Sequence, residues 1–459
     1  MTRLFGTNGI REVVGETLTA PFVTRVAAAI ASVVPAPATI AVGRDGRTSS
    51  PAFARIVSST LVLAGHRVVD LGLLATPAIQ YNVPRVGARM GVIVTASHNP
   101  PEFNGIKCIG ADGLEVPRET EEAIEAAVDR GATPAAPFSR IGSARTDDMA
   151  GDRYLDGIVA LVDRSRIEAR RFTIVLDCGN GASIPTSPEL LRRLGCRTIT
   201  LNAQVDGTFP GHLSEPTESA LTDLCRVVPA VGADLGAAHD GDADRAVFVD
   251  ASGRYVPGEQ MLALLARDAV ERHRGGTVVV PVAASQAVED IVKPLGGTVV
   301  YTRVGSPSIT REMQTRKAVF GGEDNGGLVF PAFQLARDGA MAVAATLDLL
   351  ARTGRPLADL LREIPRYTLV KEKVACPAEL RDRVLARVTE SMGSTAERVV
   401  TTDGLKAYFE GGWVLLRPSG TEPIFRISAE AKEPARARAL ADLGLERVLR
   451  ALTELGAPP

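Results

Sequence analysis

Aromatic residues are few in this chain, and its net charge is close to zero. Phe, Trp and Tyr make up 4% of the 459 residues, which argues against a surface that stacks nucleic-acid bases. The 52 Lys and Arg residues nearly balance the 54 Asp and Glu residues and leave a formal net charge of −2. The chain therefore has no overall field that would attract nucleic acid or an acidic membrane, and an anionic ligand must be bound by local arginines.

Cysteines and long apolar runs are also few. None of the five cysteines lies at C-x-x-C spacing, which gives no sign of a zinc site or a redox pair and indicates free thiols. The most apolar stretch, residues 26–42, is interrupted by Pro35 and Pro37, and the start MTRLFGTNGIRE lacks the apolar run of a signal peptide. We therefore expect a protein of the reducing cytoplasm, with no membrane segment and no nucleic-acid partner.

Three segments, residues 38–72, 171–202 and 276–303, share one plan. Each has a β-branched apolar run, a loop of polar or small residues, a helical pattern and a second apolar run. The helical patterns end near Gly65, Gly195 and Gly296, and glycine is the usual residue just past a helix C-terminus. Strand–helix–strand units with apolar strands indicate sheets covered by helices. The spacing of the three units is that of whole domains, so we expect three related α/β domains in tandem.

The last part of the chain differs from the three repeats. It has strand patterns in YTLVKEKVAC and WVLLRPSGTEPIFRISAEA and helical patterns at about 378–392 and 434–453, which indicate a smaller α+β domain. The expected fold is thus three tandem related mixed-sheet α/β domains plus a smaller C-terminal α+β domain around a central cleft. The joints are expected near Gly142–Gly151, Ala251–Gly253 and Ile364–Arg366, and the predicted domains are 1–150, 151–252, 253–366 and 367–459.

The sequence GVIVTASHNPPEFNGIK, residues 91–107, places a serine at the end of a buried strand. A loop serine is most often only a turn or cap residue. Ser97, however, has His98 beside it, Lys107 ten residues further on and two prolines after it. The segment is not G-x-S-x-G, so a hydrolase triad fits poorly. A serine held in this way is suited to be a nucleophile or a phosphate carrier.

A second polar loop, HDGDADR at residues 239–245, alternates three aspartates. Asp240, Asp242 and Asp244 can share one face, and converging carboxylates favour Mg²⁺ or Ca²⁺. An EF-hand is excluded, because Arg245 and Ala251 stand where that loop needs glycine and glutamate. Two alternatives stay open at this point: a solvated acidic turn, and a phosphatase with an aspartate nucleophile, which would leave the serine without a role.

Two further loops complete the set. In GGEDNGG, residues 321–327, Glu323 and Asn325 can face one hydroxylated ligand, although a plain glycine-rich turn would also explain the pattern. In LLRPSGTEPIFR, residues 415–426, two arginines flank small hydroxyl residues and glycine, which favours an anion pocket over a hairpin with surface arginines. A cation site, a carrier serine, a phosphate clamp and hydroxyl-binding groups together indicate phosphoryl transfer in a cleft between four domains.

These motifs carry a resemblance to a known family. TASHNP, DGDADR, GGEDNGG and RPSGTEP occur in the order and near the spacing of the α-D-phosphohexomutase superfamily, and LFGTNGIRE is similar to its N-terminus. The resemblance covers nearly the whole chain. It implies an intramolecular phosphotransferase that uses Mg²⁺ and interconverts hexose 6-phosphate and hexose 1-phosphate through a phosphoserine and a hexose 1,6-bisphosphate.

The resemblance also implies roles for individual residues. Ser97 would be the phosphoserine and, with Asp240, Asp242 and Asp244, would hold the metal; Arg245 would lie beside the metal loop and the sugar. Glu323 and Asn325 would bind the sugar hydroxyls. The remaining roles are those of the clamp for the non-reacting phosphate (Arg417, Ser419, Gly420, Thr421, Arg426) and of the reacting end (Arg11, His98, Lys107), with His98 or Lys107 as proton shuttle.

The identity of the substrate sugar is the feature that the sequence determines least. DGTFPGHLSEPTESAL, residues 206–221, and EDNGG are most similar to archaeal members of the superfamily, which favours glucosamine phosphate as substrate. Ser306 stands where those members often carry aspartate, so mannose and glucose phosphates, or dual specificity, remain alternatives. A non-catalytic sugar-phosphate-binding protein would be expected to have lost part of this set. The expected assembly is a monomer or a homodimer.

Overall fold

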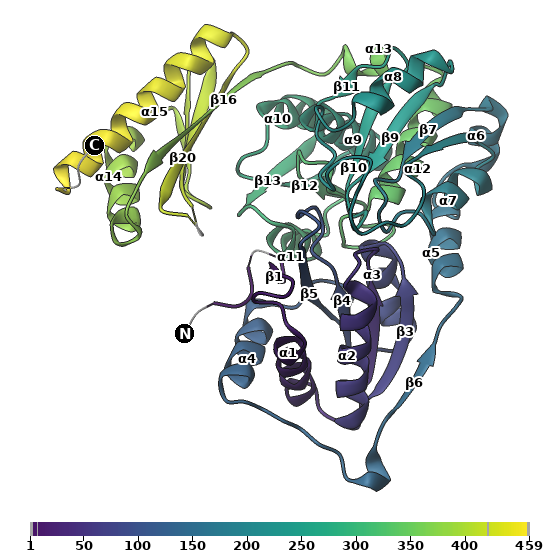
Figure 1. The fold of residues 1–459 in the computed structure, drawn as a ribbon. Helices are drawn as coiled ribbons and strands as arrows, with labels where there is room; N and C mark the ends of the chain where they lie inside the picture. Colours follow the sequence, from purple (N-terminus) through teal and green to yellow (C-terminus); the bar gives the residue numbers. More distant parts are fainter. Residues whose placement is uncertain (1–2, 7, 420–421, 457–459) are drawn as a thin grey trace.

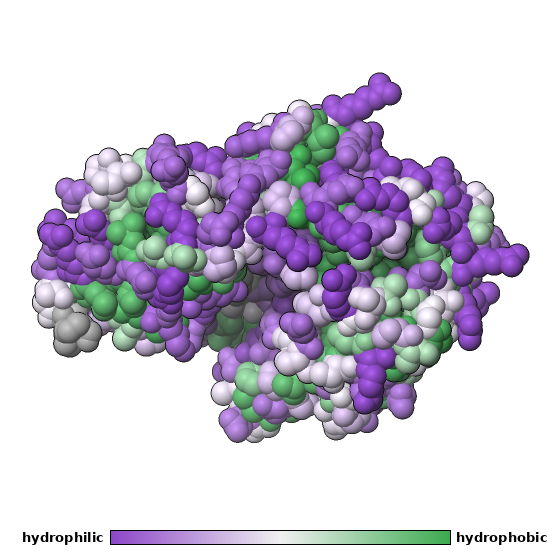
Figure 2. Space-filling view, turned by 90° about the horizontal axis from the view of Figure 1, so that it is seen from above, coloured by the Kyte–Doolittle hydropathy of each residue, from purple (hydrophilic) through white to green (hydrophobic). Residues whose placement is uncertain are grey.

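The computed structural model describes residues 3–6, 8–419 and 422–456 and contains three α/β domains followed by a smaller fourth (Figure 1). Domain IV stands apart from the other three in this view and is reached by an extended segment ahead of β16 (Thr368–Ala375). Figure 2 shows a deep recess between the lobe on its left, which is domain IV, and the rest of the molecule. The predicted fold class, including the central cleft, is confirmed.

Domain I is built on a six-stranded sheet with the order β1-β5-β4-β2-β3-β6. Its elements are β1 (Ile10–Val13), α1 (Ala20–Val33), β2 (Thr39–Arg44), α2 (Ser50–Leu63), β3 (Arg67–Leu73), α3 (Thr76–Arg85), β4 (Met90–Val94), β5 (Phe103–Gly110), α4 (Arg118–Asp129), the 3₁₀ turn η1 (Phe138–Arg140) and β6 (Ser143–Thr146).

Domain II has a five-stranded sheet with the order β11-β10-β9-β7-β8. Its elements are α5 (Ala150–Val159), α6 (Arg164–Arg170), β7 (Thr173–Asp177), α7 (Ser187–Arg193), β8 (Arg197–Leu201), α8 (Thr222–Ala230), β9 (Leu235–His239), β10 (Ala246–Asp250) and β11 (Tyr255–Val256).

Domain III has a four-stranded sheet with the order β13-β12-β14-β15. Its elements are α9 (Gly258–His273), β12 (Gly276–Pro281), α10 (Gln286–Val292), the 3₁₀ turn η2 (Lys293–Leu295), β13 (Gly297–Thr302), α11 (Ser306–Arg316), β14 (Phe320–Gly322), β15 (Leu328–Val329), α12 (Gly339–Thr353) and α13 (Leu357–Leu361).

Domain IV has a wholly antiparallel sheet with the order β16-β20-β19-β18-β17. After β16 come the 3₁₀ turn η3 (Ala378–Leu380), α14 (Arg381–Gly393), β17 (Arg398–Val400), β18 (Leu405–Phe409), β19 (Gly412–Pro418), β20 (Ile424–Ala431) and α15 (Pro434–Glu454). Helices α14 and α15 pack on one face of this sheet, and the side chains between them form a separate apolar core.

The predicted repeat is present in all three α/β domains. β2 and β3, β7 and β8, and β12 and β13 pair in parallel across an intervening helix. Gly65, Gly195 and Gly296 follow these helices with φ of 94°, 75° and 75°, the left-handed conformation that glycine adopts without steric cost. A glycine in the left-handed conformation therefore follows the equivalent helix in each of the three domains.

The sheets are mixed because each repeat adds an antiparallel strand after its third parallel one. β4 turns back into β5, β9 into β10 and β14 into β15. The three connecting loops contain Ser97, the aspartates at 240, 242 and 244, and Glu323 with Asn325. These loops occupy equivalent places in the three related domains. Each of the three polar loops therefore lies at the corresponding end of its own sheet.

Two of the stretches expected as domain joints are part of the sheets or of their turns. The stretch 142–151 contains β6, which pairs in parallel with β3, and 251–253 is the turn between β10 and β11. One apolar cluster runs through domains I, II and III without interruption, and α12 of domain III contacts α5, α6 and α7 of domain II. Since this core is shared, the boundaries at residues 150, 252 and 366 stay predictions.

No helix in the described part of the chain is both long and apolar enough to cross a membrane.

Candidate active site

Ser97 is fully buried and lies in a strained loop. Its φ of 53° is left-handed, a conformation that non-glycine residues adopt at a cost of about 1–3 kcal/mol and that persists only where the surroundings enforce it. Its Oγ donates to Asp240 Oδ2 at 3.2 Å and lies 3.3 Å from His98 Nδ1. The strand end thus aims one hydroxyl directly at the aspartate loop of the next domain.

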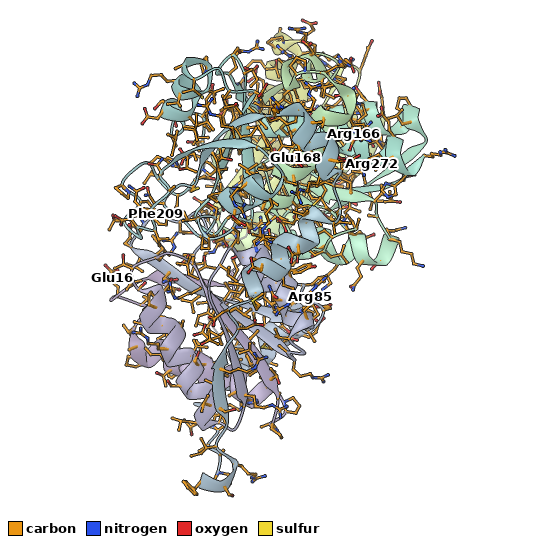
Figure 3. All side chains as sticks on the ribbon, turned by 90° about the vertical axis from the view of Figure 1, so that its right-hand side faces the viewer. Glu16, Arg85, Arg166, Glu168, Phe209 and Arg272 are labelled. Carbon is orange, nitrogen blue, oxygen red and sulfur yellow. The ribbon has the colours of Figure 1, made fainter. Side chains whose placement is uncertain are left out.

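Arg47 fixes the conformation of the loop that contains Ser97. Its buried guanidinium donates to the carbonyl oxygens of Ser97 (2.8 Å), Asn99 (2.5 Å), Pro100 (2.7 Å) and Phe103 (2.8 Å). Its charge is balanced by Asp45 at 3.2 Å, and its other face lies 5.1 Å from the ring centre of Phe209, a domain II residue that Figure 3 labels where the first two domains meet. A rigid five-donor fork suits this task better than a lysine would.

Replacing Arg47 by methionine should lower the free energy of unfolding by about 3–5 kcal/mol, because buried Asp45, the buried carbonyl of Ser97 and three partly buried carbonyls lose their partner at once. Urea denaturation of the full chain followed by circular dichroism would measure this. Arg44→Met is the matched control, since the only side-chain hydrogen bond described for Arg44 goes to one carbonyl, that of Asp45, at 3.2 Å. Equal midpoints for the two variants would contradict the role given to Arg47.

The three aspartates of the second loop form a compact buried cluster. One carboxylate oxygen from each of Asp240, Asp242 and Asp244 lies within 4.8 Å of the other two, and none of these residues is more than 2% exposed. Asp242 Oδ1 and Asp244 Oδ1 are buried and have no hydrogen-bond partner among the residues that the structure describes. Oxygen-only ligands with free buried lone pairs fit a small hard cation such as Mg²⁺.

Burial and neighbouring charges shift the pKa values of two of these three carboxylates. Burial and the neighbouring carboxylates of Asp244 and Asp242 raise the pKa of Asp240 well above its ordinary value. Burial acts in the same direction on Asp242, but the ammonium of Lys107, 2.7 Å from Asp242 Oδ2, holds the pKa of that carboxyl below its ordinary value. Arg245 Nε lies 3.8 Å from Asp240 Oδ2, so the cluster is faced by more than one cation.

The predicted reacting-end residues surround Ser97. Lys107 Nζ also lies 3.7 Å from Asp244 Oδ2, and Arg245 Nη2 lies 3.0 Å from His98 Nδ1. Arg11 donates to the Asn99 side chain at 2.9 Å and so touches the serine loop from β1. Burial, together with the positive charges of Arg245 and Arg11, lowers the pKa of His98 to about 3. The imidazole is therefore neutral at neutral pH.

Arg337 connects the aspartate loop to the sugar loop, a link that the sequence analysis missed. Its buried guanidinium donates to Asp244 Oδ2 at 2.5 Å and to Glu323 Oε2 at 3.0 Å. Burial opposes its charge, but Asp244 and Glu323 raise the pKa of Arg337 above its ordinary value. Asn325 Oδ1 accepts from the Gly327 N–H at 3.0 Å, which fixes the turn that carries both predicted hydroxyl-binding residues.

Two adjoining cavities form the cleft. The first, of about 480 Å³, is lined among others by Arg11, His98, Arg245, Glu323 and Asn325. The second, of about 590 Å³, lies between domains III and IV and is lined by Arg417, Arg426, Lys371 and Lys373. Val304 lines both cavities, so an elongated ligand can reach from the serine side to the domain IV sheet.

The open face of the domain IV sheet carries a row of cations. Arg417 lies opposite Arg426, and Arg426 lies opposite Lys373, so the three side chains stand next to one another on strands β19, β20 and β16. Arg417 pairs with Asp403 at 3.2 Å and Arg426 with Glu422 at 2.7 Å. Like charges directly across neighbouring strands destabilise a sheet, so this row is suited to an anionic ligand.

The structure brings together most of the predicted site residues. Ser97, His98, Lys107, Arg245 and the three aspartates touch one another directly, and Glu323 joins them through Arg337. Arg417, Ser419 and Arg426 lie across the cleft, in the second cavity or beside it, and do not contact this group; Ser419 Oγ accepts from the Glu422 N–H at 3.2 Å. Gly420 and Thr421 lie outside the described residues.

Four other residues at the site were not found from the sequence: Arg47, Thr76, Arg337 and Lys373. Thr76 donates to Asp242 Oδ2 at 2.8 Å from the start of α3. Arg47 stands in the polar loop after β2, and inspection of that loop by the rule applied to the others would have found it. Arg337 and Lys373 leave weaker signals, because Arg337 lies far into the loop that follows the two-residue strand β15 and Lys373 lies within strand β16.

Models of four domain families match the chain in order. They describe phosphoglucomutase/phosphomannomutase α/β/α domain I at residues 2–135, domain II at 152–253, domain III at 257–367 and the C-terminal domain at 369–444. A "Probable phosphoglucosamine mutase" of Methanopyrus kandleri is 40% identical over 455 residues, covering 99% of this chain and all of that one. The chain belongs to the phosphoglucomutase/phosphomannomutase family.

Other members of this family are similar over their whole length. A protein of Thermococcus kodakarensis named "Phosphoglucomutase/phosphomannomutase" is 38% identical over 456 residues, covering 98% of this chain and all of that one. The crystal structure of a phosphoglucomutase/phosphomannomutase family protein from Burkholderia thailandensis superposes with a TM-score of 0.88 at 27% identity, covering 99% of this chain and 98% of that one. The chain is therefore an enzyme of the α-D-phosphohexomutase superfamily, as its motifs implied.

Proposed function

We propose that this enzyme moves a phosphoryl group between O6 and O1 of a hexose, with Ser97 as the carrier and Mg²⁺ at the three aspartates. The observation that carries the proposal is the contact of Ser97 Oγ with Asp240 Oδ2 at 3.2 Å, at the edge of a buried carboxylate cluster with unpartnered oxygens. A carrier hydroxyl beside a cation site, facing a row of arginines across a cleft, matches what phosphoryl transfer between two ends of one sugar requires.

The residues present fit magnesium. Asp240, Asp242 and Asp244 would hold the ion, and a phosphate oxygen on Ser97 would complete the protein-derived set. When bound, the ion supplies Lewis-acid stabilisation of the charge that develops on the transferring phosphoryl group. Lys107 and Arg337, each paired with one of the aspartates, offset part of the repulsion between the carboxylates.

The proposed cycle contains two transfers. A sugar hydroxyl oxygen attacks the phosphorus of phosphorylated Ser97, the P–Oγ bond breaks, and the hydroxyl proton passes to the neutral imidazole of His98, or to Lys107 after its ammonium has given a proton to Asp242. The product is a hexose 1,6-bisphosphate, which turns over within the cleft. Ser97 Oγ then attacks the other phosphorus, that sugar oxygen leaves with a proton, and phosphoserine is regenerated. A trace of hexose 1,6-bisphosphate is therefore also the expected activator.

The domain IV row is proposed to hold whichever phosphate is not reacting. Arg417 and Arg426 would exchange their carboxylate partners Asp403 and Glu422 for the phosphate oxygens. Ser419, Gly420 and Thr421 are proposed as further members of the clamp on the basis of the sequence motif alone. The clamp lies in the second cavity and the carrier beside the first, so the sugar would span the two. This separation lets one clamp serve both halves of the cycle.

Replacing Lys373 by glutamine should raise the KM for the hexose phosphate by about 3- to 10-fold and leave kcat within about threefold. We expect this because Lys373 on β16 lies directly opposite Arg426 on β20 and lines the same cavity. Its charge therefore adds to the phosphate clamp without approaching the reacting end. Steady-state kinetics at fixed bisphosphate would measure both constants. Lys317→Gln, at an exposed lysine of domain III, is the control and should change neither.

Glucosamine phosphate is the substrate we propose first, because the most similar archaeal motifs favour it and a 40% identical relative carries that name. Mannose and glucose phosphates are the alternative, since a 38% identical relative is named for them. ³¹P NMR with glucosamine 6-phosphate, glucose 1-phosphate and mannose 1-phosphate, each with its bisphosphate, would name the fastest sugar. Release of free phosphate alone would favour the phosphatase alternative and overturn the proposal.

The remaining proposals concern the cell compartment, the partners and the oligomeric state of the enzyme. All five cysteines are free, at Cys108, Cys178, Cys196, Cys225 and Cys376, and we propose a cytoplasmic enzyme on that basis. We propose a small-molecule hexose phosphate as its partner, with neither nucleic acid nor membrane involved, and a monomer or homodimer as its assembly.

A further inference from the structure

A buried lysine lies at the joint between domains III and IV. Lys406, on β18, has no exposed surface and donates to the Ala284 carbonyl at 3.0 Å. Its Nζ lies 4.0 Å from the ring centre of Trp413, 4.8 Å from that of Tyr301 and 5.4 Å from that of Tyr408. We call these three rings and the lysine the aromatic cage. Domain IV contributes two of the rings, and domain III contributes the third ring and the carbonyl.

The cage is the centre of a larger set of contacts across the same joint. Glu430 Oε1 accepts from the Trp413 Nε1–H at 2.9 Å and from the Gln286 N–H of domain III at 2.8 Å. Arg398 pairs with Glu289 of domain III at 2.8 Å. The hydroxyls of Tyr408 and Tyr301 are 3.2 Å apart, so every member of this set links the two domains or orients a group that does.

A buried ammonium in such a place is costly unless its surroundings offset the loss of water. Burial lowers the pKa of Lys406 to about 7, and the negative fields of Glu430 and Glu289 oppose that decrease. Ring faces are also negative and attract a cation, more strongly when it is desolvated. In the described part of the chain Lys406 has no direct ion pair with a carboxylate, so its charge is offset mainly by the rings and one carbonyl.

The cage and the proposed phosphate clamp belong to one sheet face. Lys406 lies opposite Leu415 on β19, and Arg417 follows two residues later on the same side. Ala283, which packs against the apolar cluster of Tyr408 and Trp413, lines the cavity that contains Arg417 and Arg426, as does Val304. The Val304 N–H also donates to Asp403, the carboxylate that pairs with Arg417. The position of the clamp therefore depends on how the sheet is held at the cage.

We propose that Lys406 is a positioning residue whose caged ammonium fastens domain IV to domain III and thereby sets the position of the phosphate-binding row. The part that concerns substrate binding rests on the proposed function, whereas the part that concerns the joint does not. Without the ammonium the two tyrosines and Trp413 lose the charge that draws them together, and the sheet can tilt away from domain III. Binding of the distant phosphate would weaken, while the chemistry at Ser97 would be little changed.

Trp413 makes this joint directly observable, because it is the sole tryptophan of the chain and is 1% exposed. In Lys406→Met, which keeps the length of the side chain and removes its charge, we expect a shift of Trp413 emission to longer wavelength and at least twofold greater quenching by acrylamide. We also expect KM for the hexose phosphate to rise at least tenfold with kcat within threefold. Lys432→Met is the control, since Lys432 is exposed and lies 5.7 Å from the Tyr367 ring centre without touching the cage.

A second variant covers the case in which Lys406→Met does not fold. Tyr301→Leu removes one ring from the domain III side and leaves the charges of domain IV unchanged; it should shift emission and KM in the same direction by a smaller amount. Unchanged emission and quenching in a folded variant would overturn the proposal. If the wild type acted on none of the sugars, the proposed function would fail, and the fluorescence comparison would still decide the role of the cage. A changed emission with an unchanged KM would refute its link to the clamp.

Discussion

Replacing Ser97 by alanine will lower the rate of exchange between hexose 6-phosphate and hexose 1-phosphate by at least about 1,000-fold, because the carrier oxygen is removed. The other hydroxyl described at the cluster, that of Thr76, lies against Asp242, whereas Ser97 Oγ contacts Asp240 Oδ2. The rate would be followed by ³¹P NMR at saturating sugar with bisphosphate present. A phosphatase that uses an aspartate nucleophile would keep its activity in this variant.

Two companion variants separate chemistry from conformation. Ser97→Gly also lacks the oxygen but adopts a φ of 53° without steric cost, so it should be as inactive as the alanine variant and no less stable. Ser187→Ala is the control for removal of a buried serine, since Ser187 Oγ has no hydrogen-bond partner among the described residues and lies in α7. More than a few per cent of wild-type exchange in either Ser97 variant would contradict the carrier role.

Replacing Asp240 by asparagine should abolish tight magnesium binding and lower activity at least about 100-fold, because one of three anionic ligands is lost. The metal-free variant should be at least as stable as the metal-free wild type. Asp240 is repelled by Asp242 and Asp244, and an amide relieves that repulsion while still accepting from the Arg245 N–H. Thermal unfolding with and without Mg²⁺ would show both effects.

The size of the magnesium effect follows from mass action. At 100 times its Kd, an ion that binds only the folded state stabilises it by about 2.7 kcal/mol. That increment should appear in the wild type and in Asp250→Asn, a control at a buried aspartate of the same domain outside the cluster, and should be missing in Asp240→Asn. An equal rise in Tm for Asp240→Asn would place the magnesium elsewhere and refute the assignment.

Most of the fold was predictable because its signals are local. Three apolar runs followed by helices that end at Gly65, Gly195 and Gly296 indicate the same unit three times, and the structure confirms it. The antiparallel strands and the shared core were harder to predict. β15 has only two residues, and the packing of α12 against domain II depends on contacts between segments far apart in sequence.

The candidate site likewise contains some residues that the sequence predicts and others that it does not. Ser97, the aspartates and Glu323 lie in loops directly after apolar strands, which is where sequence patterns place ligand-binding groups. Arg337 could not be found in this way, because its importance comes from bridging Asp244 and Glu323, which belong to two different domains. Lys373 belongs to the cation row only through the register of β16 against β20, and register is not visible in the sequence of one strand.

The most direct test of the account is to locate the phosphoryl group on the protein. The enzyme would be incubated with Mg²⁺ and a hexose 1,6-bisphosphate labelled with ³³P, quenched in acid, and its peptides analysed by mass spectrometry. We predict one label per chain, on Ser97, that is lost to the sugar when unlabelled hexose monophosphate is added. A label on Asp240, Asp242 or Asp244, or none on any residue of a preparation that catalyses exchange, would contradict the central claim.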